Sequence, residues 1–68
     1  MSLENILRTT LTSRRWVIDR TFRFENGLRF DVTRGDKKST FRWHNSYAKG
    51  GQKGVIKNLE AALDALEV

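Results

Sequence analysis

The chain has 68 residues and a net charge of +5, from 13 Lys and Arg against 8 Asp and Glu, with one His and no Cys. A chain this short forms one small domain that must use nearly every apolar residue for its core, and the lack of Cys excludes disulfide scaffolds and thiolate zinc sites. No apolar run approaches the roughly 20 residues of a membrane-spanning helix, and the N-terminus lacks the apolar segment of a signal peptide. We therefore expect a cytoplasmic protein with no membrane partner. It is expected to fold as one domain over residues 1–68.

The first predicted element is a short N-terminal helix or arm over residues 1–12. Leu and Ile recur at helical spacing between Leu3 and Leu11 and form one apolar face, with Ser2 as the candidate N-cap. Threonines lower the helix propensity of this segment. The helix therefore depends on packing against the rest of the domain.

A three-stranded sheet over residues 15–44 follows, with strands expected at 15–24, 28–34 and 39–44, where β-branched and aromatic residues recur at period two. The last segment is predicted to be an amphipathic helix over residues 55–67, because its apolar residues are spaced three and four apart. The predicted fold class is α+β in the order αβββα: a three-stranded antiparallel sheet packed on the C-terminal helix, with a short N-terminal helix.

The two turns of the sheet decide which side chains share a face, because side chains alternate along a strand. If Glu25-Asn26-Gly27 forms a three-residue loop, Phe24 pairs with Leu28. A two-residue Asn26-Gly27 turn would mix apolar and charged residues on both faces, so we expect the longer loop. Gly35-Asp36 fits a two-residue type II′ turn. Both loops predict one apolar inner face, made of Trp16, Ile18, Phe22, Phe24, Leu28, Phe30, Val32, Phe41 and Trp43.

On the outer face, the same register predicts a row of three arginines across the sheet: Arg23, Arg29 and Arg42. Like charges opposite one another destabilise a sheet, so this row indicates an anionic ligand that relieves the repulsion. The alternative is that the arginine stems cover the open face while their charged heads stay solvated. Lys38 and His44 are expected on the same side of the sheet.

Basic residues are concentrated in the middle of the chain. From Arg14 to Lys57 there are 12 basic and 4 acidic residues, and all the charged side chains after Lys57 are acidic. This excess of positive charge in the middle of the chain favours a polyanionic partner. The alternative is a soluble protein that is basic without binding one.

The segment SYAKGGQKG, residues 46–54, leads into the final helix and forms a second candidate site. Backbone N–H groups at a helix start attract phosphate, and Lys49, Lys53 and Lys57 add positive charge there. The alternative is an ordinary strand-to-helix connection, since the spacing matches neither a P-loop nor GxGxxG. Tyr47 is the aromatic residue that we expect to be free for base stacking.

No catalytic or metal-binding constellation is found in the sequence. A nucleophile would need an activating base, and a zinc site would need more ligands than His44 and scattered carboxylates. We therefore expect no enzyme activity, no cofactor, no metal and no small-molecule substrate. His44 is a candidate phosphate or base contact, with a plain surface histidine as the alternative.

The segment TFRWHNSYAKGGQKGVIKNLEAALDAL resembles the last strand and second helix of double-stranded-RNA-binding domains, which also run αβββα. Where that family opens its helix with Lys-Lys-x-Ala-Lys, this chain has KGVIK and keeps only Lys53 and Lys57. The family's first loop is longer and carries Gly-Pro-x-His, whereas this chain has the short ENG turn. The resemblance implies RNA binding through the helix start, without the family's loop contact in the minor groove.

Residues 15–66 also resemble, in topology and charge placement, the three-stranded DNA-binding domains at the N-terminus of phage and transposon integrases and the plant ethylene-response type. In these families the open sheet face enters the major groove while the helix packs behind it. The resemblance implies that Arg23, Arg29 and Arg42 contact phosphates and base edges, and Arg is suited to bidentate contact with guanine.

The sequence thus predicts a small accessory or regulatory protein of bacterial or phage type that binds double-stranded DNA through its exposed sheet face. The expected nucleic-acid contacts are Arg23, Arg29, Lys38, Arg42, His44, Tyr47, Lys49, Lys53 and Lys57. One alternative is double-stranded RNA binding through the lysine-rich helix start. Another is a protein-interaction module or inhibitor that binds an acidic partner surface, with an N-terminal helix or edge strand available for a homodimer.

Overall fold

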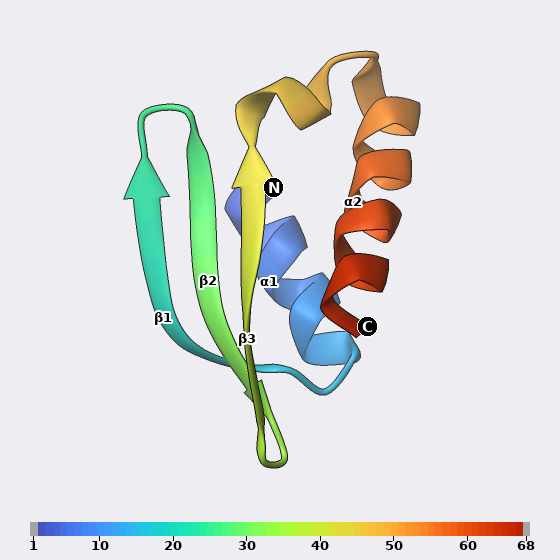
Figure 1. Cartoon of the computed structure of the whole chain (residues 1–68). Helices are drawn as coiled ribbons and strands as arrows, with labels where there is room; N and C mark the ends of the chain where they lie inside the picture. The colour runs from blue at the N-terminus through green and yellow to red at the C-terminus, as the bar shows by residue number, and fades with distance from the viewer. Residues whose placement is uncertain (1, 68) are drawn as a thin grey trace.

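The computed structural model describes residues 2–67 and contains an open antiparallel sheet in the order β1-β2-β3, with two helices packed on it (Figure 1). Met1 and Val68, the two ends of the predicted domain, lie outside the described residues. The predicted α+β class and the order αβββα are confirmed. The elements are α1 (Leu3–Ser13), β1 (Val17–Phe24), β2 (Gly27–Arg34), β3 (Lys37–His44), the 3₁₀ helix η1 (Asn45–Ala48) and α2 (Gly51–Glu67).

A single hydrophobic core lies between the sheet and the two helices. α1 and α2 bury their apolar stripes against the same sheet face, as their helical spacing predicts, and Ile18 and Leu28 pack at the margin. The opposite face of the sheet is turned away from both helices. The buried core residues are Leu7, Leu11, Trp16, Phe30, Val32, Phe41, Trp43, Leu59, Leu63 and Leu66.

α2 begins at Gly51, inside the segment that was expected to be a loop. Gly50 and Gly51 have φ values of 92° and 74°, a backbone region that suits glycine. They turn the chain from η1 into the helix. The Asn58 side chain then donates a hydrogen bond of 2.7 Å to the carbonyl of Tyr47 and fastens η1 to α2.

α1 ends in a Schellman motif whose left-handed residue is Arg15, with a φ of 70°. The Trp16 N–H donates to the Leu11 carbonyl at 3.0 Å, and the Arg15 N–H donates to the Thr12 carbonyl at 2.9 Å. Trp16 and Leu11 are both buried in the core. Glycine is usual at the position of Arg15, because the left-handed conformation costs an L-residue about 1–2 kcal/mol.

Arg15→Gly is therefore expected to raise the free energy of unfolding by about 0.5–1 kcal/mol, once the greater freedom of glycine in the unfolded chain is subtracted. Urea unfolding followed by circular dichroism measures the change. Arg14→Gly is the matched control, because Arg14 has a φ of −93° and gains no relief of strain. If Arg15→Gly destabilises the domain as much as Arg14→Gly does, the assignment of a left-handed conformation to Arg15 is wrong.

The second hairpin has the predicted register. Gly35 has a φ of 64°, and the two-residue turn Gly35-Asp36 pairs Phe30 with Phe41 and Leu28 with Trp43. Glycine in the first central position meets the requirement of a type II′ turn. Local turn chemistry was thus sufficient to predict how β2 and β3 align.

The first hairpin differs from the prediction. Phe24 pairs with Gly27, so the turn consists of Glu25 and Asn26 alone, and neither residue has a positive φ. The reason is a contact from outside the hairpin. At the start of η1, the Asn45 N–H donates to the Asn26 carbonyl at 2.8 Å, and the Asn45 side chain donates to the Glu25 carbonyl at 3.2 Å.

A β-bulge in β1 changes which side chains share a face. Ile18 pairs with Val32, but Arg20 pairs with Asp31, so Asp19 is an extra residue without a partner. One extra residue inverts the alternation of all side chains that follow it in the strand. The half of β1 after Asp19 is therefore turned over relative to the prediction.

Phe22 and Phe24, predicted for the inner face, consequently lie on the open face, and the predicted outer position of Arg23 is also wrong. Arg23 pairs with Leu28 and faces α1, where its guanidinium hydrogen-bonds the Glu4 carboxylate at 2.6 and 2.8 Å. The hydrogen bond from Arg23 lowers the pKa of the Glu4 carboxyl. A polar stretch of α1 thus meets this end of β1 and favours Arg23 there.

The other end of the sheet is tied to the C-terminus of α2. Arg34 pairs with the Glu67 carboxylate, and its guanidinium carbon lies 4.3 Å from the centre of the Trp16 ring. The Trp16 indole N–H also donates to Glu67 at 3.3 Å. The hydrogen bond from Arg34, together with that from Trp16, lowers the pKa of Glu67 to about 2.

Candidate functional site

The open face of the sheet carries four of the nine predicted site residues. Residues that pair directly across the strands point to the same face, so the register arranges them in rows. Starting at the first turn, the rows are Phe24, Gly27 and His44; then Phe22, Arg29 and Arg42; then Arg20, Asp31 and Thr40; and finally Val17, Thr33 and Lys38, with Asp19 at the bulge.

Arg29 and Arg42 are direct neighbours in the second row. The Arg29 guanidinium donates two hydrogen bonds to Asp31, of 3.1 and 3.4 Å, and lies 4.5 Å from the centre of the Phe22 ring. These contacts hold the guanidinium along the sheet. They also offset part of its repulsion with Arg42, so the arginine pair is less strained than a row of three would be.

Three further cations lie on this face without a fixed partner. Within the part of the chain that the structure describes, no hydrogen bond or ion pair is made by the side chains of Arg20, Lys38 and Arg42. All three side chains are exposed. They are available to an anionic ligand, whereas Arg29 must share its charge with Asp31.

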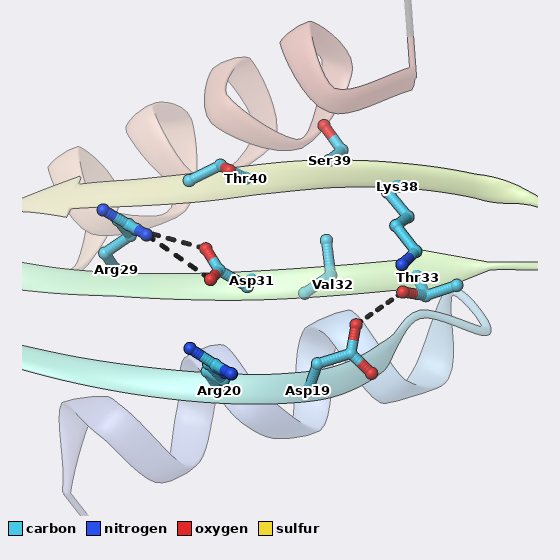
Figure 2. Close-up of a pocket in the computed structure, with 9 residues that line it drawn as sticks. All are labelled: Asp19, Arg20, Arg29, Asp31, Val32, Thr33, Lys38, Ser39 and Thr40. Carbon is cyan, nitrogen blue, oxygen red and sulfur yellow. Dashed lines mark hydrogen bonds and ion pairs between the residues drawn. The ribbon is translucent and has the colours of Figure 1, made fainter.

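An open groove crosses the three strands and has a volume of about 670 Å³. Figure 2 shows its lining: Arg29 is turned onto Asp31, the Thr33 hydroxyl donates to Asp19, and Arg20 and Lys38 extend from the outer strands. A second hollow, of about 350 Å³, lies at the first turn and also includes Arg29. Arg29 therefore links two adjoining hollows on the open face.

The open face also exposes aromatic surface. The Phe24 residue is 54% exposed, and Phe22 is half-buried beneath Arg29. A domain of this size needs nearly all its apolar residues in the core. Two phenylalanines beside arginines on an uncovered face are therefore not explained by packing.

Of the five predicted site residues that lie in the sheet, four share the open face and one does not. Arg29, Lys38, Arg42 and His44 lie there as predicted, whereas Arg23 lies on the other side of the sheet against α1. His44 has a structural role as well, because its Nδ1 accepts the Ser46 N–H at 3.0 Å and caps η1.

Tyr47 and the three lysines lie outside the sheet. Tyr47 is 39% exposed and packs edge-to-face on Trp43, with ring centres 5.3 Å apart, so its ring is partly occupied. Lys49 ends η1, and Lys53 and Lys57 are exposed in the first half of α2. The lysines form a separate basic cluster at the start of α2.

Sequence reasoning missed Arg20, Phe22 and Phe24 as residues of the open face. A signal for them was present, because uninterrupted alternation from Ile18 on the inner face also puts the charged Arg20 inside. A bulge between Ile18 and Arg20 keeps Ile18 inside and turns Arg20 outward.

Comparison of the chain with protein-family models, curated proteins and solved structures gives no match. Among residues 2–67, no group of three or more His, Cys, Asp or Glu side chains could hold a metal ion. In the same part of the chain, no helix is long and apolar enough to cross a membrane.

Proposed function

We propose that this protein binds nucleic acid through the open face of its sheet. The observation that carries the proposal is the placing of exposed phenylalanine beside arginine on the face turned away from both helices. Guanidinium groups bind phosphate oxygens with paired hydrogen bonds, and aromatic rings stack on bases. The net charge of +5 adds long-range attraction to a polyanion.

Arg29 and Arg42 form the centre of the proposed interface. Neighbouring strands are about 4.8 Å apart, so two arginines in one cross-strand pair offer their guanidiniums to the same phosphate or to consecutive ones. Asp31 keeps Arg29 oriented in the absence of a ligand. A bound phosphate would relieve the remaining repulsion between Arg29 and Arg42.

An acidic protein surface would attract the same cations, but only one that also carries an apolar patch would cover the exposed Phe24 ring. Every nucleotide supplies both a negatively charged phosphate and a flat base, which favours nucleic acid. The preference for duplex DNA, and the helix-start mode that uses Lys49, Lys53 and Lys57, stay predictions drawn from the sequence.

Fluorescence anisotropy with labelled single-stranded and duplex DNA and RNA at increasing salt tests the proposal. If Arg20, Arg29, Lys38 and Arg42 each neutralise one phosphate, a plot of log affinity against log salt has a slope of about −3 for a single strand. Absence of binding to all four probes at low salt, or an affinity that does not depend on salt, would overturn the proposal.

A further inference from the structure

We infer that the ligand of the open face is a single-stranded nucleic acid, one base of which stacks on Phe24 in the hollow beside the first turn. The inference rests on the proposed function and names the class of nucleic acid. It is carried by the shape of this hollow, the exposure of the Phe24 ring and the position of the nearest cations.

The hollow lies at the row formed by Phe24, Gly27 and His44, between β1 and β3. Gly27 has no side chain, and a Cβ there would collide with the backbone carbonyl of Trp43. Only glycine fits at this position, so no side chain of β2 separates Phe24 from His44. With a volume of about 350 Å³, the hollow lies at the lower end of the range for small-ligand pockets, as suits one base.

The exposed Phe24 ring favours a single-stranded ligand over a duplex. In a duplex the flat faces of the bases are stacked on one another, whereas an unpaired base can place its face on an aromatic side chain. Phe24 is 54% exposed, and Phe22 in the next row already has Arg29 over its ring. Phe24 is therefore the platform that a base can reach.

The cations nearest to Phe24 can contact the phosphate backbone of the nucleic-acid strand whose base stacks on that ring. Arg29 and Arg42 occupy the next row and line the hollow together with Phe24. Beyond Arg29, the groove continues to Arg20 and Lys38. A single-stranded nucleic acid with one base on Phe24 would make its first phosphate contacts at Arg29 and Arg42.

Acidic side chains on the face also favour a flexible ligand. Asp31 and Asp19 line the groove between the cations, so the positive surface is interrupted. A duplex presents a regular array of phosphates at fixed spacing, whereas a single strand can bend its backbone around the two carboxylates.

The test compares three probes by fluorescence anisotropy: labelled oligothymidine, an abasic strand with the same backbone and number of phosphates, and oligothymidine annealed to oligoadenosine. The wild-type protein is expected to bind oligothymidine at least about fivefold more tightly than the abasic strand, which is the lower limit for one stacked base. It is also expected to bind oligothymidine more tightly than the duplex. An RNA probe, oligouridine, tests whether the sugar matters.

Phe24→Ala and Phe24→Leu are expected to reduce the affinity for oligothymidine to that for the abasic strand. Phe24→Leu retains an apolar side chain and removes the ring, so its loss cannot be attributed to exposed backbone. Phe24→Trp keeps a stacking surface and should retain the preference, with quenching of its additional indole fluorescence when oligothymidine binds. Circular dichroism verifies that each variant is folded.

The inference is overturned if Phe24→Ala and Phe24→Leu bind oligothymidine as tightly as wild type does, or if the duplex binds more tightly than the single strand. In either case nucleic-acid binding itself stands, and the joint replacement of Arg29 and Arg42 decides whether the open face carries it. Failure of the wild-type protein to bind any probe at low salt would remove the proposed function itself, so the two failures are distinguishable.

Discussion

Phe30→Ala is expected to unfold the domain at room temperature, whereas Phe24→Ala should leave it folded. Phe30 is fully buried at the centre of the core, and truncation of a buried phenylalanine costs about 3–5 kcal/mol. A single core of this size supplies only about 3–5 kcal/mol in total. Phe24 lies on the open face with 54% of its surface exposed, and surface changes usually stay within about 0.5 kcal/mol.

Thermal and urea unfolding of the two variants, followed by circular dichroism, measures this difference. The pair is matched because both changes remove the same side chain from the same sheet. Uninterrupted alternation in β1 would bury both phenylalanines and make both variants unfold. Equal destabilisation would therefore contradict the bulge at Asp19 and the assignment of Phe24 to the open face.

Replacement of Arg29 and Arg42 together by Gln is expected to weaken nucleic-acid binding at least about tenfold, since a single hydrogen-bonded contact to a charged group such as phosphate is worth about 1.5–3 kcal/mol. Two lost phosphate contacts should also make the salt slope shallower by about 1.4 for a single strand. Both side chains lie on the surface of the sheet, so the double variant should remain folded. Anisotropy titrations at several salt concentrations give both quantities.

Arg23→Gln is the control within the same sheet. Arg23 lies between Arg20 and Phe24 along β1, but its side chain faces α1 and pairs with Glu4. This variant removes a positive charge without removing an open-face contact, so the salt slope should stay that of the wild type. A loss of slope equal to that of the double variant would show that the open face is not the binding surface.

The parts of the fold that local chemistry determines could be predicted from the sequence. The apolar spacing of Leu59, Leu63 and Leu66 predicts the buried stripe of α2, and these residues are in the core. Glycine in the first central position of the Gly35-Asp36 turn predicts the register of β2 and β3, which is confirmed. In both cases the necessary information lies within one element or one turn.

The register of β1 could not be predicted in this way, because contacts distant in sequence decide it. The turn at Glu25 and Asn26 is held by Asn45, and the inward position of Arg23 is favoured by Glu4. The three-residue loop is expected because it keeps all phenylalanines on one face. That expectation assumes uninterrupted alternation along β1, whereas a bulge at Asp19 keeps Ile18 inside and turns Phe22 and Phe24 outward.

The consequence for the candidate site is a change of composition. Arg29 and Arg42 could be predicted, because they belong to the hairpin whose register is local. The third member of their row is Phe22 in place of Arg23. The open face therefore combines arginine with phenylalanine, and this combination changes the expected ligand from duplex DNA to a single strand.

The most direct test of the open face as the binding surface compares two charge-matched double variants in one titration with labelled oligothymidine at low salt. One variant carries Arg29→Gln and Arg42→Gln, and the other carries Lys53→Gln and Lys57→Gln at the exposed start of α2. Each loses two positive charges. We expect the arginine variant to lose at least about tenfold in affinity and the lysine variant to bind nearly as wild type; loss of binding in the lysine variant with retention in the arginine variant would contradict the assignment.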